Sequence, residues 1–192
     1  MVKVEYAYAL EKDLKLLKTL YGNMKPMTIN IDADGTIFTH SFPEVGKEIG
    51  AVPVLKTLVE NGHKLILFTM RCDHDFEPSS DHPEIIAEKG DYLTDAVNWF
   101  ERHTIPLYGI QCNPTQYSWT KSPKSYAEFM IDDSAIGAPL LLYPEISPRP
   151  FVNWFELVPM LWKKRLITTA QTVSLRDEIE EFFKLTYNIN MT

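Results

Sequence analysis

Two carboxylates, Asp32 and Asp34, stand two residues apart directly after the apolar run TINI and directly before a glycine and a threonine. Like charges this close at the end of a buried strand raise the free energy unless a cation compensates them or water solvates them. The pair therefore indicates either an exposed Asp-Gly turn or part of a metal site.

Other polar residues follow further apolar runs. Thr69 ends KLILFT, Asp132 and Asp133 end FMIDD, and Lys124 precedes Asp132 by eight residues. In a doubly wound parallel sheet the carboxyl ends of the strands converge on one crevice, so we expect these residues to share a site. Carboxylates gathered there would repel by on the order of 4 kcal/mol per close pair at an effective dielectric of ~20. Mg²⁺, which takes one or two carboxylates and leaves positions for waters and phosphate, would relieve that repulsion.

These residue types predict phosphoryl transfer. Asp32 can attack phosphorus in line to form an aspartyl-phosphate, provided that cations offset the repulsion between two anions. Asp34 is placed to protonate the leaving oxygen and then to activate water against the aspartyl-phosphate. Thr69 and Lys124 would hold the phosphoryl oxygens.

The four motifs and their order resemble those of the haloacid dehalogenase superfamily. DADGT at 32–36 resembles its first motif, KLILFT its second, Lys124 its third and IDD at 131–133 its fourth. More closely, DGTIFTHSFPEVGKEIG, ENGHKLILFTMR and SYAEFMIDD look like a subgroup of small bacterial and phage-type phosphatases with no large cap domain. The resemblance spans roughly residues 26–166. It implies an α/β fold, a Rossmann-like three-layer sandwich with a mostly parallel sheet and a minimal cap or none.

The resemblance also implies roles for the acidic residues. Asp32 would be the nucleophile and Asp34 the general acid and base, with Mg²⁺ held by the Asp32 carboxylate, the Asp34 main-chain carbonyl and Asp132. Asp133 would bind the metal directly or through water. Superfamily members that cleave carbon–halogen bonds lack the acid equivalent to Asp34, so its presence favours phosphate transfer.

Residues beside the motifs are predicted to contact the substrate: Gly35, Thr36, Met70 and Arg71. Arg71 could neutralise substrate charge or form a surface salt bridge, and both interpretations stay open. Lys121 competes with Lys124 as the phosphate ligand. The spacing from Lys124 to Asp132 resembles that of the subgroup, which favours Lys124.

Several further residues are weaker candidates. His40, Phe42 and Trp119 could touch a substrate, but such side chains are more often packing residues. A second metal site could be formed by acidic and histidine residues of a polar segment, whose irregular spacing instead favours solvated surface charge: His74, Asp75, Glu77, Asp81 and His82.

Alternating apolar patterns predict one structural domain of strands and helices. We expect strands at 28–31, 64–68, 107–111 and 129–131, and helices at 9–20, 52–60, 92–102, 151–162 and 174–187. Pro159 is expected to kink or end its helix, and Ser174 and Asp177 to cap the last one. Residues 37–50 would form a small hairpin or flap and residues 72–90 a long loop, which together close a capless site. The predicted parts are an N-terminal helical extension (1–25), the catalytic core (26–166) and a C-terminal helix (167–192).

Composition bounds the partners and the compartment. The net charge of −7 argues against nucleic acid or an anionic membrane as the main partner. Two cysteines, too few for a disulfide framework, and the lack of a signal peptide or of ~18 consecutive apolar residues favour the cytoplasm. Apolar residues on the terminal helices are expected to dock on the core, with a homodimer contact as the alternative: Leu10, Leu14, Leu17, Ile179, Phe182 and Phe183.

These patterns predict a Mg²⁺-dependent phosphatase that acts on a small phosphorylated metabolite, sugar phosphate or nucleotide. A signalling receiver domain also combines acids, a hydroxyl and a lysine around Mg²⁺. Its acidic pair comes first and a single phosphoacceptor follows, whereas here a paired motif opens the series and another closes it. A non-catalytic binding protein of the same fold is the third alternative, against which the intact set of acidic and basic residues argues.

Overall fold

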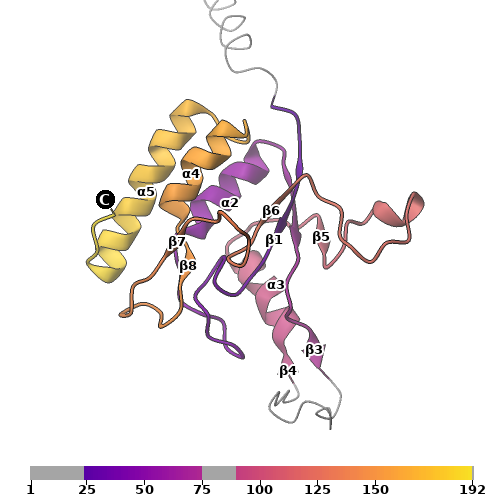
Figure 1. The fold of residues 1–192 in the computed structure, drawn as a ribbon, viewed down its shortest axis with the longest axis horizontal. Coiled ribbons are helices and arrows are strands. Elements are labelled where there is room, and N and C mark those ends of the chain that lie inside the picture. The colour runs from indigo at the N-terminus through magenta and orange to yellow at the C-terminus, as the bar shows by residue number, and fades with distance from the viewer. Residues whose placement is uncertain (1–23, 75–89, 192) are drawn as a thin grey trace, which may run out of the picture.

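The computed structural model describes residues 24–74 and 90–191, so the helix predicted at 9–20 and residues 75–89 of the predicted loop lie outside it. A four-stranded parallel sheet stands at its centre, in the order β5-β2-β1-β6 (Figure 1). The strands are β1 (Thr28–Ile31), β2 (Lys64–Leu67), β5 (Gly109–Ile110) and β6 (Phe129–Ile131). This sheet confirms the predicted α/β, Rossmann-like architecture.

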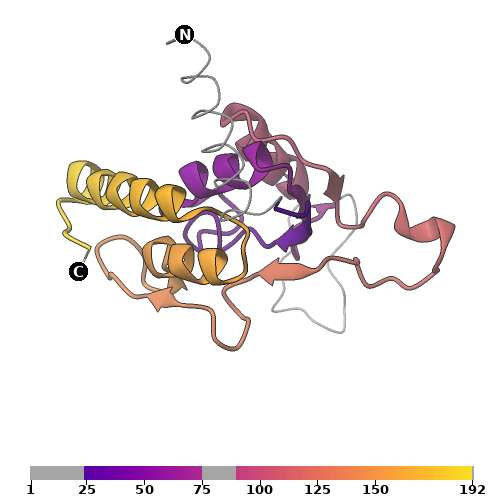
Figure 2. The ribbon, with the colours of Figure 1, turned by 90° about the horizontal axis from the view of Figure 1, so that it is seen from above.

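The described residues form four α-helices around the sheet: α2 (Ala51–Glu60), α3 (Tyr92–Arg102), α4 (Trp154–Lys163) and α5 (Thr169–Tyr187). The path from β1 through α2, β2 and α3 to β5 moves across the sheet in one direction, so right-handed crossovers put both helices on one face. The connection from β5 to β6 returns across the other face and holds only the short 3₁₀ helix η1 (Gln116–Ser118). Figures 1 and 2 show η1 on the side of the sheet away from α4 and α5.

The core forms between the sheet and the helices. Ile29 and Ile31 of β1 are fully buried, as is the apolar part of β2, which explains its continuous apolar run. Helix α5 docks on α2 and α4 through Ile179 and Phe183. Gly50, the residue before α2, has φ +85°, and a Cβ there would lie 3.2 Å from Ile179. The predicted docking of the last helix on the core is thus confirmed.

Four short strands of the described residues were missed by the apolar pattern because each has only two residues. Strand β3 (Asp73–His74) pairs antiparallel with β4 (Gly90–Asp91), so the ends of the predicted loop at 72–90 form a narrow ladder. Strand β8 (Phe151–Val152) pairs with β7 (Leu140–Leu141), which delays the start of α4 until Trp154. The predicted strand at 107–111 shrinks to Gly109–Ile110.

The helix boundaries differ most at the C-terminus. Helix α3 matches its predicted bounds, whereas α5 begins at Thr169, and caps at Ser174 and Asp177 are therefore wrong. Thr168 forms the capping box instead, because its hydroxyl accepts the Gln171 N–H and the Gln171 side chain accepts the Thr168 N–H. Pro159 does not end α4, which continues to Lys163.

The flap expected at 37–50 forms a loop closed by one antiparallel bridge, Phe38 with Glu48. The Thr39 N–H also donates to the Lys47 carbonyl at 3.0 Å. None of the described helices combines the length and apolar character needed to cross a membrane.

Candidate metal centre and active site

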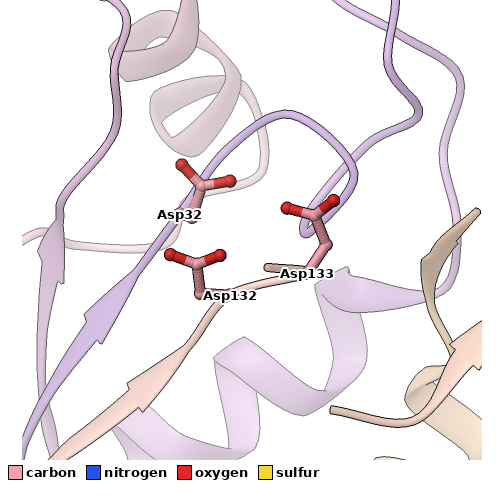
Figure 3. Close-up of side chains that lie close together, drawn as sticks. All are labelled: Asp32, Asp132 and Asp133. Atoms are coloured by element: carbon pink, nitrogen blue, oxygen red, sulfur yellow. The ribbon is translucent and has the colours of Figure 1, made fainter. Parts of the chain in front are cut away.

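Three carboxylates meet at the carboxyl ends of two neighbouring strands. Asp32 follows β1, Asp132 and Asp133 follow β6, and one oxygen of each lies within 4.8 Å of the other two (Figure 3). The Asp32 N–H donates to the Ile131 carbonyl at 3.0 Å, which continues the β1–β6 ladder up to the cluster. Within residues 24–74 and 90–191, this is the one group of three or more potential metal ligands.

The donor set fits a hard divalent cation. All three ligands are carboxylate oxygens, which Mg²⁺ prefers. Oxygens on opposite sides of an Mg²⁺ ion are about 4.2 Å apart, since each bond is about 2.1 Å. The three oxygens of the cluster lie within 4.8 Å of one another, so rotations of the side chains would bring them to one ion.

The electrostatics of Asp32 also favour a cation. The pKa of Asp32 is raised to about 7, chiefly by burial and, to a smaller extent, by the charges of Asp132 and Asp133. A hydrogen bond from the Ala33 N–H and one from Thr36 oppose this rise without cancelling it. In the metal-free protein Asp32 is therefore partly protonated near neutral pH, and a bound cation would favour its carboxylate.

Thr36 links the two acidic motifs. Its fully buried hydroxyl donates to Asp32 Oδ2 at 3.2 Å and accepts the Asp133 N–H at 3.0 Å. The structure thus places this predicted substrate contact behind the carboxylates, where it orients them.

Gly35 allows the chain to turn between the two motif-one acids. Its φ is +78°, and a Cβ there would clash with His40 Nε2 and lie 2.8 Å from Asp133 Oδ2. His40 Nε2 is 3.0 Å from Asp133 Oδ2, so the flap reaches the acid cluster through this contact. His40, a weak candidate from the sequence, therefore contacts a predicted metal ligand.

Asp34 points away from the cluster and toward Arg71. Arg71 donates Nε–H to Asp34 Oδ2 at 2.7 Å and Nη2–H to Oδ1 at 2.8 Å. It also donates to the carbonyls of Pro43 and Glu44 in the flap, at 3.0 and 2.7 Å. Arg71 thus forms a salt bridge, one of the two interpretations left open by the sequence. The predicted place of that salt bridge at the surface is wrong, because only 1% of the Arg71 side chain is exposed.

The end of β2 is fixed by a residue that sequence reasoning missed. The Gln111 side chain accepts the Thr69 N–H and donates to the carbonyls of Thr69 and Arg71. This fixes the backbone of Thr69 just beyond the carboxyl end of β2, while Met70 is 96% exposed. A polar residue just after the short strand β5 was the one available signal for Gln111.

Lys124 is exposed, but the residue next to it is anchored on the sheet. The Ser125 hydroxyl donates to Asn30 Oδ1 at 3.1 Å, and Asn30 Nδ2 donates to the Ser125 carbonyl at 3.2 Å. Asn30 lies two residues before Asp32 on β1. The backbone beside Lys124 is therefore held close to the cluster. Neither Lys124 nor Lys121 forms a salt bridge with another described residue.

Comparisons with known proteins support the fold and name no activity. A scan against protein-family models finds no match, and a search of curated proteins finds no relative. Among solved structures, a conserved protein of Bacteroides thetaiotaomicron is similar, with 28% identity and a TM-score of 0.52. The alignment covers 77% of this chain and 97% of that one, so almost all of that protein corresponds to part of this fold.

Proposed function

We propose that this chain is a Mg²⁺-dependent phosphatase that hydrolyses phosphomonoesters through an aspartyl-phosphate on Asp32. The observation that carries the proposal is the convergence of Asp32, Asp132 and Asp133 at adjoining strand ends. Asp32, the main-chain carbonyl of Asp34, Asp132 and Asp133 would hold Mg²⁺, which offsets the charge of the phosphate and of the carboxylates when it is bound.

The first half of the reaction forms the covalent intermediate. A carboxylate oxygen of Asp32 attacks phosphorus, the new O–P bond forms, and the bond from phosphorus to the leaving oxygen breaks. Asp34 gives its proton to that oxygen. The Thr69 hydroxyl and the Lys124 ammonium would hold the phosphoryl oxygens.

The second half restores the enzyme. Water attacks phosphorus, Asp34 takes the proton from that water, and the bond between phosphorus and Asp32 breaks to release phosphate. Both Asp34 oxygens accept Arg71 N–H groups, yet each carboxylate oxygen retains a second lone pair for the proton. The Arg71 fork would keep this acid and base in one orientation.

A small phosphorylated metabolite, sugar phosphate or nucleotide would be the substrate, and the flap, which reaches Asp133 through His40, would close over it. A chain with two cysteines, too few for a disulfide framework, is compatible with the cytoplasm as the compartment.

Phosphate release from a panel of sugar phosphates, nucleotides and polynucleotide ends, with Mg²⁺ or with EDTA, tests this proposal. Wild type is expected to release phosphate only with Mg²⁺, and Asp32→Asn and Asp34→Asn to lose most of that activity. Asp177→Asn, the same substitution at an exposed position on α5, is the matched control. Equal rates for wild type and Asp32→Asn would exclude the mechanism. Stable labelling of Asp32 by acetyl phosphate without turnover would instead favour a receiver-like phosphoacceptor.

A further inference from the structure

Exposed aromatic and basic side chains gather on the connection between β5 and β6. Tyr117 and Trp119 are each 60% exposed and Tyr126 is 46% exposed. Lys121 and Lys124, both exposed, lie between them in the sequence. We call these five residues the aromatic–basic surface. Figure 2 shows this connection projecting from the sheet on the side away from α4 and α5.

Buried amides hold this connection in shape. Gln116, which is fully buried, donates to the Ser122 carbonyl at 2.7 Å and accepts the Tyr126 N–H at 2.9 Å. Asn113, also buried, donates to the Tyr126 carbonyl at 3.1 Å. Buried amides are stable only when bonded, so these contacts fix the backbone. The exposed rings are thus presented by an ordered scaffold.

The rings themselves form a small platform. Trp119 and Tyr126 pack edge to face, with ring centroids 5.4 Å apart and an interplanar angle of 88°. This contact leaves large parts of both rings in water. Aromatic faces of this kind bind nucleic-acid bases by stacking, whatever the base.

The local charge differs from the charge of the whole chain. No Asp or Glu occurs from Arg102 to Ala127, whereas the chain as a whole carries a net charge of −7. The first acid beyond this stretch is Glu128, which accepts the Thr28 N–H at 2.7 Å. The argument from net charge against nucleic acid therefore does not apply to this surface.

The surface runs alongside β1 toward the acid cluster. Lys124 adjoins Ser125, which bonds Asn30 near the end of β1, while the Tyr126 hydroxyl reaches Glu128 beside Thr28 at the start of that strand. The rise from Thr28 to Asp32 is roughly 13 Å at 3.3 Å per residue. This length is on the order of four stacked bases at 3.4 Å per base.

We propose that the aromatic–basic surface binds a single-stranded polynucleotide whose terminal phosphate enters the acid cluster. The bases stack on Trp119, Tyr126 and Tyr117, and the lysines contact the phosphates that lead to the site. The hydrolysis of that terminal phosphate rests on the proposed function, but the binding does not. A mononucleotide is too short to contact the aromatic rings and the acid cluster at the same time. The surface therefore favours longer polynucleotides.

The binding test uses the full-length Asp32→Asn variant in the presence of Mg²⁺, since the substitution itself prevents turnover. End-phosphorylated single-stranded DNA and RNA of one, two, four and eight nucleotides are titrated by fluorescence anisotropy. Affinity is expected to rise up to about four nucleotides and to fall as salt is added. Trp119→Ala is expected to weaken octamer binding about tenfold and to leave mononucleotide binding unchanged.

Matched variants separate this surface from general effects. Trp162→Ala replaces another exposed tryptophan, on α4, and is expected to have no effect on binding. Lys121→Gln is expected to weaken octamer binding and to lower its salt dependence. Equal affinity for one and eight nucleotides overturns the proposal, as does equal binding of duplex and single strand.

Two outcomes keep this inference distinct from the proposed function. Length-dependent binding without phosphate release from any substrate would support the surface and overturn the phosphatase. Hydrolysis of small phosphomonoesters without length-dependent binding would support the phosphatase and overturn the inference about the surface. A dimer in sedimentation that dissociates on Trp119→Ala would also overturn the inference, because a second copy would then cover the rings.

Discussion

Arg71 and Lys124, the two basic residues that the sequence motifs predict for the site, lie in opposite environments. Arg71 is buried and donates four hydrogen bonds, two to Asp34 and two to flap carbonyls. Lys124 is exposed and forms no salt bridge with the described residues around it. A cation whose donors are satisfied by the protein orients other groups, whereas one with free donors is available to a ligand. We therefore propose a positioning role for Arg71 and phosphate binding for Lys124.

The largest expected effect is the loss of folding stability when Arg71 is replaced. Arg71→Met leaves the Asp34 carboxylate and the Pro43 and Glu44 carbonyls without these donors, and we expect a loss of about 3–5 kcal/mol in the free energy of unfolding. Chemical denaturation measures this loss. Arg176→Met removes the more exposed ion pair with Glu156, so it should cost at most about 1 kcal/mol. Similar losses for both variants would contradict the positioning role.

Removal of Lys124 tests the other half of the comparison. Lys124→Ala is expected to lower kcat by about 10²- to 10³-fold, because one charge that stabilises the transition state is lost. Its unfolding free energy should stay within about 0.5 kcal/mol of wild type, as for other surface substitutions. Phosphate release and denaturation are measured on the same preparation, with Lys121→Ala as the control. If Lys121→Ala had the larger effect on kcat, the assignment of Lys124 would be wrong.

Conservative exchanges sharpen the difference further. Arg71→Lys keeps the charge but lacks the planar fork, so we expect a loss of about 1–3 kcal/mol from unsatisfied buried groups. Because position 124 is exposed to solvent and can hold a larger side chain, Lys124→Arg should keep kcat within about tenfold of wild type. Chemical denaturation measures the unfolding free energy of Arg71→Lys, and phosphate release measures kcat of Lys124→Arg. Full stability in Arg71→Lys would show that the fork is not needed.

The smallest expected effect is on the pH dependence of the cluster formed by Asp32, Asp132 and Asp133. Because burial raises the native pKa of Asp32 to about 7 from its ordinary value of 3.8, the metal-free native state keeps a proton that the unfolded chain releases. Its stability therefore falls as pH rises between those values. Mg²⁺ needs the deprotonated carboxylate, so its stabilisation should grow over the same interval.

Melting curves with and without Mg²⁺, below and above neutral pH, check this prediction. The increase in Tm caused by Mg²⁺ should be a few degrees larger at the higher pH, and Asp32→Asn should remove that difference. An effect of Mg²⁺ that is the same at both pH values would mean that Asp32 is not a ligand.

The sequence predicted the parts of the site that strand ends place directly. Asp32, Asp132 and Asp133 each follow an apolar run of a parallel sheet, and that topology alone brings them together. The orientation of Asp34 could not be predicted, because it depends on Arg71, and Arg71 depends on carbonyls of the flap. Backbone carbonyls leave no signal in a sequence.

The same limit explains the misplaced elements. Two-residue strands such as β3 and β8 are set by their partners and are too short to show a period. The start of α5 was missed because Thr168 and Gln171 satisfy each other's backbone while Ser174, a plausible cap by residue type, lies inside the helix. Local residue type predicts where a helix can begin, and tertiary packing selects among those positions.

The central claim is that Asp32 becomes phosphorylated within the acid cluster. Acid quench during turnover, followed by proteolysis and mass spectrometry of the peptide that contains Asp32, tests it most directly. We predict a gain of one phosphoryl group on Asp32, only with Mg²⁺, and a larger trapped fraction in Asp34→Asn because hydrolysis of the intermediate is slowed. Phosphate release by wild type with no phosphoryl group on Asp32 at any quench time would contradict the account.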